Sequence, residues 1–98
     1  MLKLNKTKEP KHIIRTYSAG VFYGRVRERS GQEVIIDEAR RIWSWKGANT
    51  LSEVALHGVN PESRLSEPVT VLVLQVIEII ECTPEAEAAM DALGWGND

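Results

Sequence analysis

The sequence predicts an α+β fold, an antiparallel sheet of four to six strands with two short helices. Three observations lead to this prediction. The first half of the chain contains runs that alternate apolar and polar residues and are rich in β-branched and aromatic side chains. The second half contains two segments with helical start and stop signals. The longest apolar run, residues 69–80, is interrupted by Gln75 and Glu78, so it is too short and too polar to span a bilayer.

The strands are predicted from this alternation and from the turn residues between the runs. The run 12–19 is followed at Gly20 by a second run, and "RSGQE" is a turn signal that makes 21–37 a β-hairpin. "RRIWSW" (40–45) continues as a fourth strand after "EVIIDEA" (33–39). The valine-rich run 69–81 is long enough for one strand or for two strands without a clear turn.

Two helices are predicted from their end signals. "TLSEVALHG" (50–58) begins with a threonine followed three residues later by glutamate, which is a capping box, and it ends at Gly58. "TPEAEAAMDALG" (83–94) has threonine as N-cap residue, proline at the first helical position, acids in the first turn and Gly94 at its end. The intervening "NPESRLSEP" is predicted to be a loop.

Length and charge limit the domain organisation and the partners. Ninety-eight residues make one domain, predicted over 12–98 after a lysine-rich flexible arm at 1–11. Residues 1–49 carry eleven Lys and Arg against five Asp and Glu, whereas residues 50–98 carry one against nine. This dipolar balance suits an anionic ligand or a homo-oligomer, and the pI of about 5.7 disfavours nucleic acid. The lack of an apolar stretch after the first lysines and a lone cysteine favour the cytoplasm.

The sequence offers little for catalysis. His12 and His57 are the only histidines, one beside the polar arm and the other at a helix end. Cys82 lies directly before an N-cap residue, a setting typical of a small buried side chain rather than of a reactive thiol. No spacing of cysteine and histidine indicates a metal site. We therefore expect a protein that is not an enzyme and that holds no cofactor or metal.

Arginines are the first candidate ligand-binding residues. Arg25, Arg27 and Arg29 share one face of a predicted strand, and Arg40 and Arg41 form a second basic site. Guanidinium groups present forked donors that suit phosphate oxygens. Several of them on one sheet without intervening acids would need an anion or an acidic partner. The alternative is an ordinary solvated sheet face.

Two tryptophans extend this candidate site. Trp43 and Trp45 share a strand face with Arg41, whereas Arg40 lies on the other face. An indole beside an arginine can stack on a nucleobase while the guanidinium binds phosphate. Asn49, just before the helix, could contact a base or ribose. The alternative is that the indoles fill the core, which is the better expectation for one of the two.

The segments "RTYSAGVFYGRV", "GQEVIIDEARRIWSWKGANTLSEVALHGV" and "VIEIIECTPEA" resemble a family of small phage and prophage proteins that share an ARRxWxWxGA pattern. This family is in turn similar to the Thoeris anti-defence sponges, which sequester cyclic ADP-ribose-type signals, and in some cases cyclic oligonucleotides, between the subunits of a homo-oligomer. The resemblance implies a phage anti-defence protein that acts in the cytoplasm of the infected bacterial host.

We therefore expect the protein to bind a cyclic nucleotide immune signal without cleaving it. The ligand-binding residues predicted for this role are Arg25, Arg27, Arg40, Arg41, Trp43, Trp45 and Asn49. The alternative function is a protein-binding inhibitor that docks its basic strand face on an acidic host protein, because the same arginines would serve it.

Overall fold

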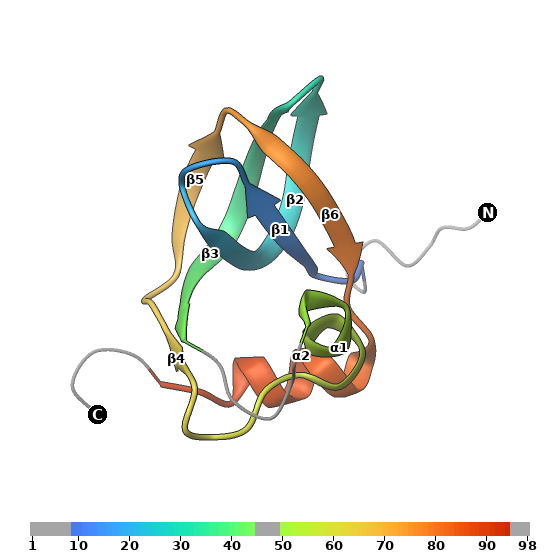
Figure 1. Cartoon of the computed structure of the whole chain (residues 1–98), viewed down its shortest axis with the longest axis vertical. Coiled ribbons are helices and arrows are strands. Elements are labelled where there is room, and N and C mark those ends of the chain that lie inside the picture. The colour runs from blue at the N-terminus through green and yellow to red at the C-terminus, as the bar shows by residue number, and fades with distance from the viewer. Residues whose placement is uncertain (1–8, 45–49, 95–98) are drawn as a thin grey trace.

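The computed structural model describes residues 9–44 and 50–94 and confirms the predicted α+β fold. Within these two ranges, six strands form one antiparallel sheet, and two helices cover one end of it (Figure 1). The strands are β1 (His12–Thr16), β2 (Val21–Ser30), β3 (Glu33–Ser44), β4 (Arg64–Leu65), β5 (Val69–Val73) and β6 (Val76–Glu81). The helices are α1 (Leu51–His57) and α2 (Pro84–Asp91).

The sheet is strongly curled. Its strand order is β4-β3-β2-β1-β6, and β5 pairs with β3 as well. One edge of β3 is occupied by β2. Along the other edge of β3, the strands β4 and β5 therefore lie end to end. β5 and β6 are therefore at opposite margins of the sheet, yet only Leu74 and Gln75 separate them in the chain. The sheet consequently bends into a partly closed barrel (Figure 1).

Each face of the curled sheet carries its own apolar cluster. Ile13 and Ile14 are both fully buried, and they belong to different clusters because successive side chains of a strand point to opposite faces. Ile14 packs inside the curl with side chains of β2, β3, β5 and β6. Ile13 packs with Tyr23 and with the buried residues of both helices. The two helices thus complete the core on the outer face.

The strand boundaries correct one prediction and resolve another. Segments 33–39 and 40–45 were predicted as separate strands, which was wrong for the described part, because β3 runs without a break to Ser44. The strand contains a bulge at Glu38, whose φ of 55° coincides with register shifts against both neighbouring strands. The run 69–81 forms two strands. The predicted loop contains the two-residue strand β4.

The helix signals are confirmed by hydrogen bonds. Thr50 Oγ1 accepts a bond from the Glu53 amide at 3.2 Å, and Thr83 Oγ1 accepts one from the Ala86 amide at 3.1 Å. Gly58 ends α1 with a φ of 79°. The second helix ends at Asp91, three residues before the glycine predicted to stop it.

The start of the described chain is tied to α2. Lys11, the last residue of the predicted arm, is buried, and its ammonium group lies 5.1 Å from the centre of the Tyr23 ring. Its backbone amide donates to Glu87 Oε2 and its Nζ to Asp91 Oδ1, both at 3.0 Å. The first and last described elements are therefore fastened together. Residues 1–8 of the predicted arm lie outside the described residues.

Gly58 is expected to be hard to replace. A Cβ at this position would lie 2.6 Å from the Ala89 Cβ, and the positive φ disfavours any side chain. We expect Gly58→Ala to lower the free energy of unfolding by about 2–4 kcal/mol in urea titrations. Gly31→Ala is the matched control, since Gly31 also has a positive φ, of 61°, but meets no atom within 4 Å. Equal losses for the two variants would contradict a role for the α1–α2 contact.

Candidate ligand-binding site

A cavity of about 520 Å³ opens between β5 and the turn that joins β1 to β2. Its walls come from Thr16 at the end of β1, Ser18 and Ala19 of the turn, Phe22, Arg41 and residues 71–75. Most of these side chains are apolar, and Arg41 is the one ionisable group among the described residues that line the cavity. Such a cavity has the composition of a small-molecule site, in which a few polar groups orient a ligand on apolar walls.

Arg41 gives the cavity its charge. It lies directly across from Phe22 in the β2–β3 register, and its guanidinium carbon is 4.8 Å from the centre of the Phe22 ring. The ring supports the cation by a cation–π interaction. Within the described parts of the chain, no carboxylate oxygen lies within 4 Å of this guanidinium. The exposed cation is therefore available to an anionic ligand.

The β1–β2 turn holds the cavity wall in a fixed position beside this cation. Thr16 Oγ1 accepts a hydrogen bond from the Ala19 amide and donates one to the Gly20 carbonyl, both at 2.8 Å. Gly20 has a φ of 99°, which favours glycine. A Cβ placed there would lie 3.6 Å from Arg41 Nε, in van der Waals contact. The turn and the guanidinium are thus close neighbours.

Trp43 lies on the same face of β3 as Arg41 and is 70% exposed. It lines a smaller hollow of about 130 Å³ together with Arg64, Leu65 and Ser66. Arg64 is exposed, and among the described residues it has no carboxylate partner. A flat apolar ring therefore shares this hollow with the Arg64 guanidinium, on the face of β3 that carries Arg41. Arg64 was not predicted as a ligand-binding residue, because its segment was predicted to be a loop. Its one sequence signal is that residues 50–98 contain no other Lys or Arg.

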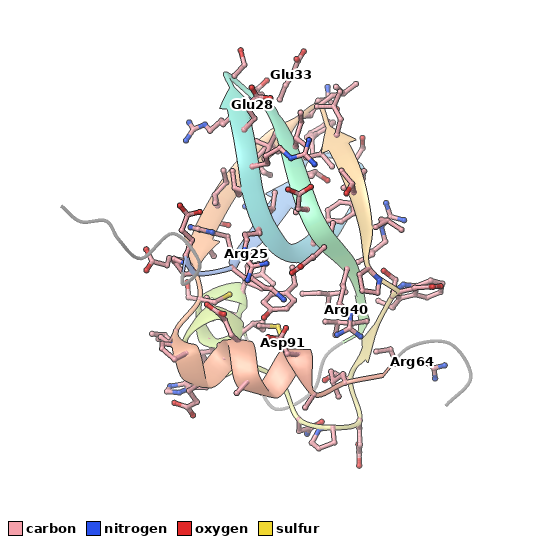
Figure 2. The ribbon with its side chains drawn as sticks, turned by 180° about the vertical axis from the view of Figure 1, so that it is seen from behind. Arg25, Glu28, Glu33, Arg40, Arg64 and Asp91 are labelled. Carbon is pink, nitrogen blue, oxygen red and sulfur yellow. The ribbon has the colours of Figure 1, made fainter. Side chains whose placement is uncertain are left out.

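Arg40 is on the opposite face and belongs to the core. It is 4% exposed, and its guanidinium donates to the carbonyls of Ser66, Met90, Leu93 and Gly94 at 2.8–2.9 Å. Figure 2 shows Arg40 between β3 and the C-terminal end of α2. Burial lowers the pKa of Arg40 below its ordinary value. A group so fully engaged does not reach the cavity, so its expected role in ligand binding finds no support in this geometry.

Arg25 and Arg27 are neutralised by acids on the neighbouring strand. Arg25 pairs with Glu38, and Arg27 forms two hydrogen bonds to the Asp37 carboxylate at 2.7 and 2.9 Å. The hydrogen bonds from Arg27 lower the pKa of Asp37. The expectation that no acids separate these arginines was wrong, because β3 places Asp37 directly across from Arg25. Neither arginine lines the cavity (Figure 2 labels Arg25).

Trp45 and Asn49, the last two predicted ligand-binding residues, lie outside the described residues. Of the seven predicted side chains, the structure therefore brings Arg41 and Trp43 to one surface and directs Arg40 to the other. It adds Phe22 and Arg64, which sequence reasoning did not select.

Outside this site, the titratable groups of the described residues form no catalytic constellation. Cys82 is buried, and burial raises the pKa of its thiol to about 12. His57 Nδ1 lies 3.7 Å from Glu85 Oε2 on the surface of the two helices. No group of three His, Cys, Asp or Glu side chains in residues 9–44 and 50–94 is placed to hold a metal ion. In the same residues, no helix has the length and apolar character needed to cross a membrane.

Comparison with known families gives one match. The sequence pattern of a family described as a domain of unknown function (DUF6948) matches residues 9–90, which include every described strand and nearly all of α2. No curated protein and no solved structure matches the chain.

Proposed function

The chain belongs to the DUF6948 family, whose description gives no function, and from the geometry of its cavity we propose that it binds a cyclic nucleotide and holds it without cleaving it. The observation that carries this proposal is the Arg41 guanidinium, exposed and supported by Phe22 at the wall of a largely apolar cavity. Phosphate is the anion that best uses such a forked donor, which can form two parallel hydrogen bonds with it.

The neighbouring indole supports a nucleotide over inorganic phosphate. Trp43 projects on the Arg41 side of β3, so a phosphate on Arg41 leaves an attached base within reach of the exposed ring. Stacking of a base on an aromatic side chain contributes about 1–3 kcal/mol. The cavity volume of about 520 Å³ lies inside the range of about 300–1,000 Å³ that is usual for small-molecule sites.

The proposed role is retention, not turnover. Among the described residues that line the cavity are the hydroxyls of Thr16 and Ser18, but no histidine or carboxylate to take a proton from them or from water. A protein that binds a signalling nucleotide tightly lowers its free concentration. Together with the resemblance to phage anti-defence sponges, this supports a protein that sequesters a cyclic immune signal in the cytoplasm of an infected bacterium.

The rival proposal, an inhibitor that docks its basic strand face on an acidic host protein, has less support. Arg25 and Arg27 would have to exchange Glu38 and Asp37 for carboxylates of the partner. Such an exchange of one surface ion pair for another yields little free energy.

Isothermal titration calorimetry tests the proposal. We expect one or more ligands to bind from a panel of cyclic ADP-ribose isomers and cyclic mono-, di- and trinucleotides, and we expect chromatography to recover the bound ligand intact. Arg41→Gln should raise the dissociation constant at least about tenfold, because it removes a charge-assisted bond of about 1.5–3 kcal/mol.

Arg29→Gln is the matched control. Arg29 is also exposed, but it lies at the far end of β2 and its Nε donates to the Gly31 carbonyl. Its loss should leave the affinity unchanged. An absence of binding to every member of the panel, or equal losses of affinity in the two variants, would contradict the proposed site.

A further inference from the structure

The free edge of β5 offers a second surface besides the cavity wall, which residues 71–73 of this strand form in part. Among the described residues, β5 pairs with β3 alone, so the backbone amides and carbonyls along its other edge have no strand beside them. Figure 1 shows β5 at the margin of the molecule with no strand outside it. An unpaired edge of this kind readily accepts a strand from another chain.

The sequence of β5 lacks the usual protection of an exposed edge. "VTVLV" contains no charged residue, and the nearest proline, Pro68, lies just before the strand. Leu72 is 54% exposed and Leu74, directly after the strand, is 59% exposed. Natural edge strands are commonly blocked by lysine, proline or a bulge. The exposed leucines and the uncharged strand together favour coverage by another chain.

The two ends of this edge carry opposite charges. Near the C-terminal end of β5, Leu72 shares a hollow of about 260 Å³ with Glu28 and Glu33, whose charges Arg29 offsets in part. Beyond the N-terminal end lies β4 with Arg64, since β4 and β5 follow one another along β3. In Figure 2, Glu28 and Glu33 lie at one end of the molecule and Arg64 at the other.

At the β4 end of this edge, Arg41 adds to the positive charge of Arg64, and Glu67 in the β4–β5 connection offsets part of it. Each end therefore keeps a net charge, negative beside the hairpin tip and positive beside β4.

We propose that β5 pairs antiparallel with β5 of a second copy of this chain, joining two sheets across a twofold axis. Antiparallel self-pairing places the Glu33 end of one copy beside the Arg64 end of the other, and it does so twice. Parallel self-pairing would place like charges together, which is unfavourable. The charge pattern thus selects both the partner and the direction of pairing.

The paired edge is short, with five residues in each strand. It therefore provides less area than the roughly 800 Å² per partner of a standard stable interface, and we expect a reversible dimer whose population depends on concentration. Leu72 and Leu74 also line the proposed ligand cavity, but no nucleotide is required for this pairing. A measurement of mass without nucleotide therefore tests the pairing separately from ligand binding.

Sedimentation velocity across a concentration series, without added nucleotide, tests the pairing. The wild-type chain should shift from 11.0 kDa towards twice that mass as its concentration rises. Leu72→Lys and Leu74→Lys, both at exposed positions, should each raise the dissociation constant about tenfold or more by placing a charge at the edge. Leu56→Lys is the matched control, since Leu56 is 50% exposed but lies on α1, and it should leave the dimer unchanged.

A charge exchange tests the direction. Arg64→Glu and Glu33→Arg should each weaken the dimer about two- to fivefold, and the double variant should restore it. A wild-type chain that stays monomeric throughout, or leucine variants that dimerise like wild type, overturns the proposal. A dimer that both leucine variants disrupt but the charge exchange does not restore overturns the antiparallel arrangement.

Discussion

Arg40→Met is expected to lower the free energy of unfolding by about 3–5 kcal/mol, a large part of the stability of so small a domain. The substitution keeps an unbranched apolar stem but removes the guanidinium donors that satisfy four carbonyl oxygens, three of them at the end of α2. Buried carbonyls without a partner are costly, and the positive charge at a helix C-terminus is lost as well. Urea denaturation followed by circular dichroism measures the change.

Arg41→Met is the matched control for this prediction. The two arginines are adjacent in sequence, but Arg41 is exposed and contacts Phe22 through its guanidinium. We expect its replacement to change the unfolding free energy by less than about 1 kcal/mol while it impairs ligand binding. A small loss of stability in Arg40→Met would show that the end of α2 does not depend on this side chain.

Raising the pH from 9 to 12 is expected to destabilise the protein steeply. Burial raises the pKa of Cys82 from 9.0 to about 12, and burial together with the hydrogen bond to Asp91 raises the pKa of Tyr23 above its ordinary 10.0. In this window the unfolded chain releases protons that the folded chain retains. The stability is therefore fully present below pH 9 and falls as the pH rises, by up to about 1.4 kcal/mol per pH unit for each group.

Variants separate the two groups. Cys82→Ala removes the thiol, so the fall in unfolding free energy should become shallower from pH 9 upwards. Tyr23→Phe removes the phenol, so its effect on the slope should begin near pH 10. Each variant is compared with wild type by urea titrations at several pH values. Slopes that match wild type in both variants would mean that neither group titrates differently in the folded and unfolded chains.

Local signals predicted the helices well. The caps at Thr50 and Thr83 use hydrogen bonds that span three residues, so the sequence near each cap contains nearly all the information needed. The strand ends were less predictable. The bulge at Glu38 depends on pairing with both neighbouring strands, and no glycine or proline marks it. The break between β5 and β6 follows from the curl of the whole sheet.

The candidate site was predictable only in part. Alternation along β3 correctly separated Arg41 and Trp43 from Arg40, but it could not say which face would be buried. The acceptors of Arg40 come from residues 26 to 54 positions later in the chain. The "RSGQE" turn sets the register only at the tip of the hairpin. A register shift between Val26 and Glu28 then changes which residues lie across from Arg25, so its acidic neighbours could not be predicted from the turn alone.

The attachment of Lys11 to α2 has a consequence for biosynthesis. Its partners Glu87 and Asp91 follow 76 and 80 residues later, and α2 covers the Tyr23 side of the sheet. A nascent chain therefore exposes that apolar surface until residues 84–91 have left the ribosome. Contacts between such distant residues also slow folding. We expect the domain to acquire its native state only after α2 has left the ribosome, with chaperones shielding the uncovered sheet until then.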